Sequence, residues 1–383
     1  MMLIHVVERG DTLWQLGRMY GVSPEAIAAS NGIANPNELV VGQSLVIPTN
    51  VGNATPAIRR SLETNAYFVQ SGTAAVQEVS SLAPVLTYLS PFSYQAQQDG
   101  SISMQLDDTS LLQAARSQGV TPLLVLTNWQ GNMFSSDVAH TILTSEVLQN
   151  TLIENVLQTM GAKGYRGLNI DFEYVYPQDR TLYNQFLQMV VDRLHREGLL
   201  VSSALAPKIS ATQQGLLYEA HDYPVHGRLC DFVVLMTYEW GWIGGPPMAV
   251  SPIDQIRQVL NYAITAIPPA KILMGVSVYG YDWKLPYVSG TRAETLTPLQ
   301  AVERAAAHQV SILYDANAQA PYYMYKAQDQ AEHIVWFEDA RSFQAKLDLV
   351  GEYNLRGISF WSYPTDFPQV PMLLANRFRV VKR

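Results

Sequence analysis

Eight short apolar runs within residues 61–383 constrain the fold of this chain more than any other feature. Most of the gaps between them hold an amphipathic helix, for example 145–164 and 179–198, and both of these segments end in glycine. Continuous apolar strands that alternate with helices indicate a parallel sheet covered on both faces, and eight such units predict a closed (β/α)8 TIM barrel of the α/β class. The runs are NAYFV (65–69), PVLTYL (84–89), TPLLVLT (121–127), GLNIDFEY (167–174), LLVSSALA (199–206), DFVVLMTY (231–238), KILMGVSVYG (271–280) and GISFWSY (357–363).

A doubly wound open sheet is the alternative to a barrel. It normally carries a glycine-rich phosphate-binding turn after its first strand, and none of the early runs has one. One gap is unusual, because residues 281–337 contain a helix (296–309) and the strand-like pieces SILYD, PYYMYKA and EHIVWFE. We expect this segment to form a small α+β insertion between the seventh and eighth strands, where it would wall the cleft.

Composition and charge exclude several classes of protein. The chain of 383 residues is 48% hydrophobic and 15% charged, which excludes a disordered protein. Its net charge of −8 and its lack of Lys/Arg runs argue against nucleic acid or an anionic membrane surface as a partner. No segment approaches the roughly 18 apolar residues of a membrane span. The start, MMLIHVVERGD, lacks a basic flank, so we expect no signal peptide.

The first 48 residues form a separate pattern. An alternating strand (4–10) is followed by a helix that opens at Asp11, a second helix that opens at Ser23, and a closing strand (43–48), in the order βααβ. The small and polar residues at 49–60 are typical of a linker. We therefore expect an N-terminal module at 1–48, a linker at 49–60 and the barrel at 61–383.

The N-terminal module resembles a LysM domain over its whole length. The resemblance rests on the V-x-x-G-D-T-L-W start, the Y-G-V-S stretch and the N-P-x-x-L-x-x-G-Q-x-L-x-I-P end. It implies binding to N-acetylglucosamine-containing glycans, peptidoglycan or chitin, through two loops. From the residues alone, Asp11 could serve only as a helix cap and Pro36 only as a turn residue. The residues implied are Gly10, Asp11, Thr12, Leu13, Asn35, Pro36 and Leu39.

The fourth apolar run carries the strongest chemical signal. Asn169, Asp171 and Glu173 alternate with apolar residues, which places all three polar groups on one face of a central strand. That face must point into the barrel. The spacing separates the two carboxylate residues by only about 7 Å of backbone, so each charge raises the proton affinity of the other. One carboxyl group is then expected to hold a proton near neutral pH, as a general acid must.

GLNIDFEY resembles the catalytic strand of family 18 glycoside hydrolases, the chitinase-like barrels, whose fuller signature is D-G-x-D-x-D-x-E. Gly167, Asp171 and Glu173 match it, whereas Arg166 and Asn169 stand at its two outer acidic positions. Two other strand ends agree with the family. LMTYEW, with Met236, Tyr238 and Glu239, resembles the M-x-Y-D segment with Glu in place of Asp, and Trp361 resembles the tryptophan that floors the sugar subsite.

The resemblance implies a substrate-assisted, retaining mechanism, since two carboxylates on one strand cannot flank a sugar from opposite faces. Glu173 would protonate the glycosidic oxygen while the 2-acetamido carbonyl of the substrate attacks the anomeric carbon. Asp171 would orient that amide, Tyr238 would hydrogen-bond its oxygen, and Trp361 would stack on the ring. We further expect Asn169 to donate a hydrogen bond to Asp171 and to favour its ionised form.

Other chemistries receive little support. The seven histidines lack metal-ligand spacing and Cys230 precedes an apolar run, so no metal and no cofactor are expected. The aromatic loop YEWGWIGGPP suits either glycan stacking or plain loop anchoring.

Three functions compete. In the strings NIDFEY, ALAPK and VVLMTYEWG the chain resembles more closely the LysM-bearing cortical-fragment N-acetylglucosaminidases of bacterial endospores. This resemblance implies hydrolysis of spore cortex peptidoglycan or its muramic-δ-lactam fragments. A chitinase or chitooligosaccharide hydrolase, and a non-hydrolytic glycan-binding or spore coat protein, are the alternatives. The first function implies synthesis in the mother cell and a place at the spore coat or cortex surface, with cell-wall association as the alternative.

Overall fold

The computed structural model describes residues 2–48, 59–363 and 366–383. Its largest sheet closes into a parallel barrel, because β7 pairs with β10 at one side and β19 pairs with β3 at the other. Each barrel strand overlaps one of the eight predicted runs, so the predicted TIM barrel is confirmed. The barrel strands are β3 (Arg60–Phe68), β4 (Tyr88–Pro91), β7 (Thr121–Thr127), β10 (Gly167–Asp171), β11 (Leu200–Leu205), β12 (Phe232–Leu235), β13 (Ile272–Ser277) and β19 (Gly357–Tyr363).

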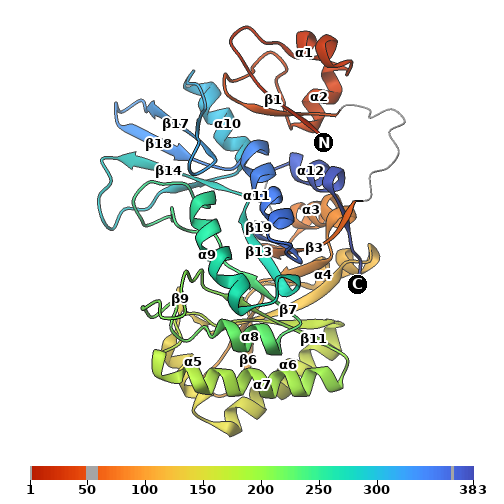
Figure 1. Ribbon diagram of the computed structural model, residues 1–383, viewed down its shortest axis with the longest axis vertical. Coiled ribbons are helices and arrows are strands. Elements are labelled where there is room, and N and C mark those ends of the chain that lie inside the picture. The colour runs from red at the N-terminus through yellow and green to blue at the C-terminus, as the bar shows by residue number, and fades with distance from the viewer. Residues whose placement is uncertain (1, 49–58, 364–365) are drawn as a thin grey trace.

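Helices surround this barrel, as Figure 1 shows. The helix α6 begins after a Ser145 side-chain cap and ends at Gly164 in the left-handed conformation, as its sequence predicts. The covering helices are α3 (Thr73–Leu82), α4 (Thr109–Ser117), α5 (Ser136–Leu143), α6 (Glu146–Lys163), α7 (Arg180–Arg196), α8 (Tyr223–Leu229), α9 (Ile253–Ala266), α11 (Ala340–Glu352) and α12 (Gln369–Arg377). Short strands decorate the barrel at β5 (Tyr94–Ala96), β6 (Ile102–Met104), β8 (Trp129–Gln130), β9 (Met133–Phe134) and β20 (Phe378–Val380). Among the described helices none is both long and apolar enough to cross a bilayer.

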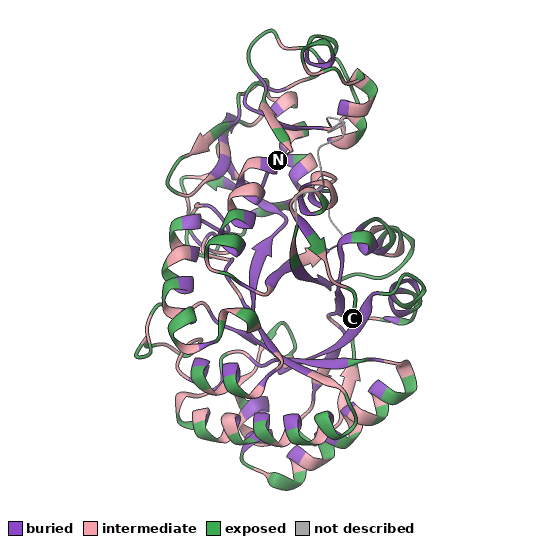
Figure 2. Ribbon diagram, turned by 45° about the vertical axis from the view of Figure 1, so that its right-hand side comes forward, coloured by how far each residue is buried: buried purple, intermediate pink, exposed green. Residues whose placement is uncertain are grey.

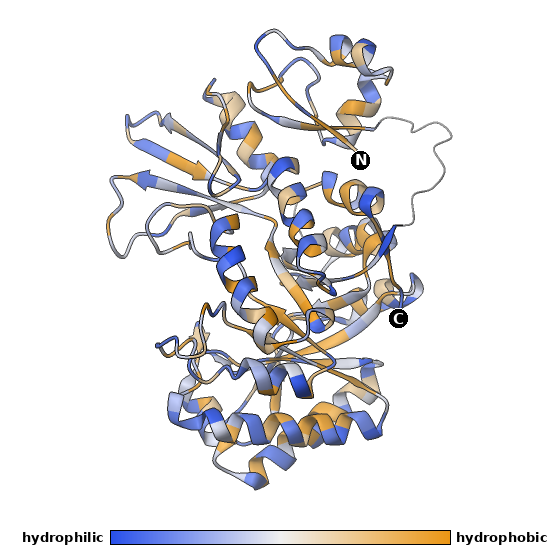
Figure 3. Cartoon of the chain, in the orientation of Figure 1, coloured by the Kyte–Doolittle hydropathy of each residue, from blue (hydrophilic) through white to orange (hydrophobic). Residues whose placement is uncertain are grey.

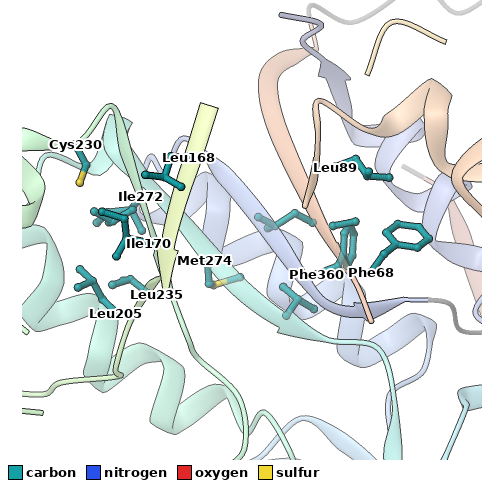
Figure 4. Packing of buried hydrophobic residues seen from close by; sticks show 14 of the residues in the cluster. Phe68, Leu89, Leu168, Ile170, Leu205, Cys230, Leu235, Ile272, Met274 and Phe360 are labelled. Carbon is teal, nitrogen blue, oxygen red and sulfur yellow. The ribbon is translucent and has the colours of Figure 1, made fainter. Parts of the chain in front are cut away.

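Two layers of apolar side chains stabilise the barrel. The layer between strands and helices includes Leu168 and Ile170 of β10 together with Leu205, Leu235 and Met274 (Figure 4). The barrel interior is filled by side chains from β3, β4, β7, β12 and β13, so it is a packed core. Figures 2 and 3 show the same division, with buried, hydrophobic strands inside and exposed, hydrophilic helix faces outside. The residues of β10 that alternate with Leu168 and Ile170 therefore face the barrel interior.

The segment after β13 forms the small α+β insertion that the sequence predicts. Its sheet is antiparallel in the order β15-β14-β18-β17-β16, and the helix α10 packs on one face of it. Two of its strands, β14 and β15, were not among the predicted pieces. The elements are β14 (Gly280–Leu285), β15 (Glu294–Leu296), α10 (Pro298–Ala307), β16 (Leu313–Asp315), β17 (Ala320–Lys326) and β18 (Glu332–Trp336).

The N-terminal module has the predicted βααβ order, with β1 (Leu3–Val6), α1 (Leu13–Tyr20), α2 (Pro24–Ser30) and β2 (Ser44–Ile47). One predicted cap is wrong. The Thr12 side chain, rather than Asp11, accepts from the backbone at the start of α1, while the Asp11 carboxylate accepts from the Glu8 amide and contacts His5. The predicted linker at 49–60 lies outside the described residues except for its last two positions.

The module packs directly on the rest of the chain. The Ile312 amide donates to the Val41 carbonyl at 2.8 Å, and the Arg341 guanidinium donates to the Gly42 carbonyl at 2.9 Å. A Cβ at Gly42 would lie 1.9 Å from the Ile312 carbonyl oxygen, so the close approach of these two backbones requires glycine there. Val40 is buried in the same apolar cluster as α10 and the insertion sheet. The module is therefore docked through backbone hydrogen bonds and a shared core.

Candidate active site

The end of β10 places the predicted carboxylates in one cleft. Asp171 and Glu173 line a cleft of about 790 Å³, and Met236, Tyr238, Glu239 and Trp361 line it too. Loops that follow several barrel strands supply the rest of the wall, as expected at the carboxyl ends of barrel strands. Trp240 and Trp242 of the predicted aromatic loop are also among the lining residues. The structure thus brings together the predicted residues of three separate strands.

Burial governs the charge of the two carboxylates. It raises the pKa of Asp171 to about 7. Burial also raises the pKa of Glu173 well above its ordinary value, and the negative charges of Asp171 and Glu239 raise it further. Because the two groups interact strongly, they titrate as a pair, and the pair retains a proton at neutral pH. Glu173 is the member that the electrostatics favour as the proton carrier.

Asp171 also carries an unused acceptor. Its Oδ1 atom is buried and has no hydrogen-bond partner among the described residues. A buried carboxylate oxygen without a donor is costly, so a donor group on a ligand would stabilise it. An amide N–H in the cleft is the kind of group that would satisfy it.

The predicted contact between Asn169 and Asp171 is wrong. The Asn169 amide nitrogen donates to the Ser202 hydroxyl at 2.9 Å, and its oxygen accepts from the Tyr67 hydroxyl at 2.8 Å. Residues two apart on a strand lie about 7 Å apart, so partners on neighbouring strands reach Asn169 first. Asn169 is buried and is not among the residues that line the cleft. The raised pKa of Asp171, caused by burial, is also opposite to the expected effect.

Glu239 is the third carboxylate of the cleft. It has a positive φ of 65°, an uncommon conformation for a residue other than glycine. Its Oε1 accepts from the hydroxyl groups of Tyr279 and of Tyr281, the latter at 2.9 Å. Burial raises the pKa of Glu239, and the two tyrosine hydrogen bonds oppose that rise. The tyrosines therefore hold a charge close enough to Glu173 to raise its pKa.

Two buried residues that the sequence did not reveal fix the backbone at Glu173. The Asn128 side chain accepts from the Glu173 amide at 2.9 Å and donates to the Glu173 carbonyl at 2.8 Å. His221 accepts from the Ala206 amide, so its other ring nitrogen donates to the Phe172 carbonyl at 3.0 Å. Burial lowers the pKa of His221 to about 4, which keeps the ring neutral. These hydrogen bonds join residues that are far apart in the sequence, and no local sequence signal indicates them.

Aromatic residues absent from the sequence prediction complete the cleft. Trp129 and Phe134 of the β8–β9 hairpin pack edge to face at 4.9 Å between ring centroids. The predicted residues Tyr238 and Trp361 stack beside them, with 15° between their ring planes. The flat faces of aromatic rings suit the apolar faces of sugars. The further lining residues are Tyr67, Phe92, Tyr174, Tyr218 and Tyr281.

The predicted glycan-binding residues of the module divide into three groups. Asn35 and Leu39 line a second cavity, of about 670 Å³, next to α10. Leu13 is only 2% exposed and belongs to the module core, and its predicted part in glycan binding stays a prediction. The remaining four lie on the module surface outside that cavity. Hydrogen bonds from the Glu8 backbone amide and with the His5 side chain lower the pKa of one of them, Asp11. These four are Gly10, Asp11, Thr12 and Pro36.

A metal site finds no support in the described part of the chain, where no cluster of three or more His, Cys, Asp or Glu residues has suitable geometry. Cys230 is buried beside the Ser203 hydroxyl, and burial raises the pKa of its thiol to about 12. Cys230 is therefore a core residue, and its protonated thiol is not a nucleophile.

Glu239→Gln is expected to move the alkaline limb of the kcat/KM profile to lower pH. Removing the Glu239 charge removes one cause of the raised Glu173 pKa, so the proton on Glu173 is lost at lower pH. A glutamine oxygen still accepts from Tyr279 and Tyr281, which preserves the cleft. The pH–rate profile is compared with that of Glu146→Gln, an exposed position on α6. An unmoved alkaline limb would exclude electrostatic coupling between Glu239 and Glu173.

Comparisons with known proteins agree with this geometry. Residues 66–366 match the model of glycosyl hydrolases family 18, and residues 5–48 match that of the LysM domain. The chain is 42% identical to the cortical fragment-lytic enzyme of Bacillus subtilis (strain 168), over 100% of this chain and 99% of the relative. It is 40% identical to the cortical fragment-lytic enzyme of Bacillus anthracis, over 100% of both chains.

Solved structures give the same result. The crystal structure of the Bacillus cereus spore cortex-lytic enzyme SleL superposes with a TM-score of 0.95 at 38% identity, over 100% of this chain and 99% of that one. A chitinase from Chromobacterium violaceum, with a TM-score of 0.75 at 24% identity over 82% of this chain and 98% of that one, shares the fold.

Proposed function

Because the chain belongs to family 18 of the glycosyl hydrolases and carries a LysM domain, we propose that it hydrolyses N-acetylglucosaminyl bonds in spore cortex peptidoglycan or its muramic-δ-lactam fragments. It is a glycoside hydrolase, and its LysM and catalytic domains indicate binding of N-acetylglucosamine-containing glycans. The full-length relatives named as cortical fragment-lytic enzymes support the cortex as substrate. Germination is the stage at which this activity would act.

The unpartnered Oδ1 of Asp171 is the observation that carries the mechanism. A 2-acetamido N–H placed in the cleft would satisfy this oxygen and align the acetamido carbonyl with the anomeric carbon. The substrate then supplies the nucleophile that neither carboxylate can supply from the opposite face of the sugar. As the oxazolinium forms, the Asp171 carboxylate stabilises its positive charge.

Glu173 supplies the proton. Its raised pKa keeps it protonated at neutral pH, so it donates to the glycosidic oxygen as the bond to the leaving sugar breaks. The resulting carboxylate then takes a proton from water, which attacks the anomeric carbon, opens the oxazoline and restores the acetamido group. Two displacements at one carbon retain the anomeric configuration. The proton and the electron pairs balance, and no cofactor is required.

The remaining cleft residues are assigned to substrate positioning. Tyr238 has a hydroxyl with no hydrogen bond to a described residue, and it would donate to the acetamido oxygen during attack. Trp361, packed against Tyr67 and Phe92, presents a fixed ring to the sugar face. Met236 and Glu239 complete the same subsite.

The relatives also support a spore-associated location, which we assign to the spore coat or cortex surface.

Measuring the reducing ends that the protein releases tests which glycan is its substrate. Purified cortex fragments and colloidal chitin are supplied at equal N-acetylglucosamine content, and products are identified by mass spectrometry. Faster release from cortex fragments is the expected result. Faster release from chitin would instead favour a chitinase, and no release from either would favour a glycan-binding or coat protein.

A further inference from the structure

The cavity beside α10 has one wall from the LysM module and one wall from the catalytic domain. Asn35, Glu38 and Leu39 belong to the module, whereas Glu303 and Ala307 belong to α10. Figure 1 shows the module lying beside α10 at the top of the molecule. No single domain of the chain therefore forms this cavity.

Its chemistry suits a carbohydrate. Its lining combines polar side chains with apolar ones, among them Leu39, Val40, Leu299 and Val302. Sugars present apolar ring faces together with many hydroxyl and amide groups, so a mixed lining of this kind matches them.

Three charged side chains of the walls are free to bind a ligand. The side chains of Arg9, Glu38 and Glu303 form no hydrogen bond and no ion pair within residues 2–48, 59–363 and 366–383. A bound glycan would supply partners for them without breaking any contact of the protein. Acceptors on both walls can therefore bridge one ligand.

Contacts between the module and the catalytic domain fix the positions of the two walls relative to each other. The Val41–Ile312 and Gly42–Arg341 contacts fix the module, and Val40 inserts into the core that α10 shares with the insertion sheet. The cavity consequently needs little ordering when a ligand binds, which favours affinity.

The cavity is separate from the catalytic cleft. One face of the insertion sheet carries Tyr281, which lines the cleft, whereas the other face packs against α10. The sheet and the helix, each roughly 10 Å thick, stand between the two sites.

We propose that α10 and the loop 32–41 of the module form one composite binding site for an N-acetylglucosamine-containing glycan segment distinct from the segment being cleaved. The proposal rests on glycan binding by the module and adds the catalytic domain as the second half of the site. Holding a second segment at a fixed separation from the cleft raises the effective concentration of substrate in polymeric cortex.

Isothermal titration with the hexamer of N-acetylglucosamine tests the proposal. The full chain carries Glu173→Gln so that the hexamer is not consumed. Two binding sites are expected, the cleft and the composite site. Adding Ala307→Trp fills the cavity from the exposed end of α10 and is expected to weaken the second site by at least about tenfold. Ala162→Trp, at the exposed end of α6, is the matched control and is expected to keep both sites.

A double-mutant cycle separates one composite site from two independent ones. Asn35→Ala alone is expected to weaken the second site, but to add no further loss once Ala307→Trp is present. Glu303→Lys gives a second change on the same wall, and thermal unfolding checks each variant. A second site that survives both α10 substitutions, additive losses in the cycle, or a single site in the parent would each overturn the composite site. Hydrolysis of cortex by the wild-type chain tests the proposed activity separately.

Discussion

Glu173→Gln is expected to lower kcat on cortex fragments by about 10²–10⁴-fold, the range that general acid–base catalysis contributes. Glutamine has nearly the same shape but cannot give a proton to the glycosidic oxygen or later accept one from water. The Asn128 contacts are made to the Glu173 backbone, so the substitution leaves them in place. Glycan binding is therefore expected to persist while turnover is lost.

Initial rates with cortex fragments measure this loss, and titration with the N-acetylglucosamine hexamer measures binding in the same variant. Glu146→Gln on the surface of α6 makes the same chemical change outside the cleft and serves as the control. Turnover within tenfold of wild type would remove Glu173 as the proton donor. Lost binding with an unchanged unfolding temperature would instead assign it to substrate affinity.

Asp171→Asn is expected to lower kcat by about 10²–10³-fold, the usual cost of removing one group that stabilises transition-state charge. The amide can still orient the substrate through its oxygen, but it carries no negative charge to stabilise the oxazolinium. KM is expected to change much less than kcat, because the lost interaction strengthens only as positive charge develops.

The pH–rate profile of Asp171→Asn distinguishes this role from a structural one. Burial raises the pKa of Asp171 to about 7, so ionisation of the carboxylate pair gives wild-type kcat/KM an acid limb near that pH. The variant is expected to lose that limb. Its alkaline limb is expected to move to lower pH, since one charge that raises the Glu173 pKa is gone. Asp99→Asn, at an exposed turn, is the control. A variant with wild-type limbs would contradict the role of Asp171.

The barrel was predictable because each strand is a continuous apolar run with a helix after it, and burial on both faces leaves few other folds for that pattern. Asp171 and Glu173 were predictable for a related reason. Their alternation with Leu168, Ile170 and Phe172 fixes which face of β10 they occupy, whatever lies opposite.

Contacts between distant segments were not predictable in the same way. Asn169 has a polar side chain on the predicted face, but its partners Tyr67 and Ser202 come from other strands, and no local rule selects them over Asp171. Tyr279 and Tyr281 reach Glu239 because the chain turns into the insertion at that point.

The docking of the module was missed for a similar reason. The small and polar residues after Pro48 indicate a linker, and a linker usually joins independent domains. The surfaces that meet are carried by Val40, Val41 and Gly42 on one side and by Ile312 on the other. Their complementarity exists only once both parts are folded.

The anomeric configuration of the first product is the most direct test of a cleft in which Glu173 carries the proton and the substrate supplies the nucleophile. Cortex fragments are cleaved in deuterated buffer, and proton NMR follows the new reducing end before mutarotation. Retention of the substrate configuration is expected, because the oxazolinium forms and opens by two displacements at one carbon. An inverted first product would show direct attack by water and would contradict the roles proposed for Asp171 and Glu173.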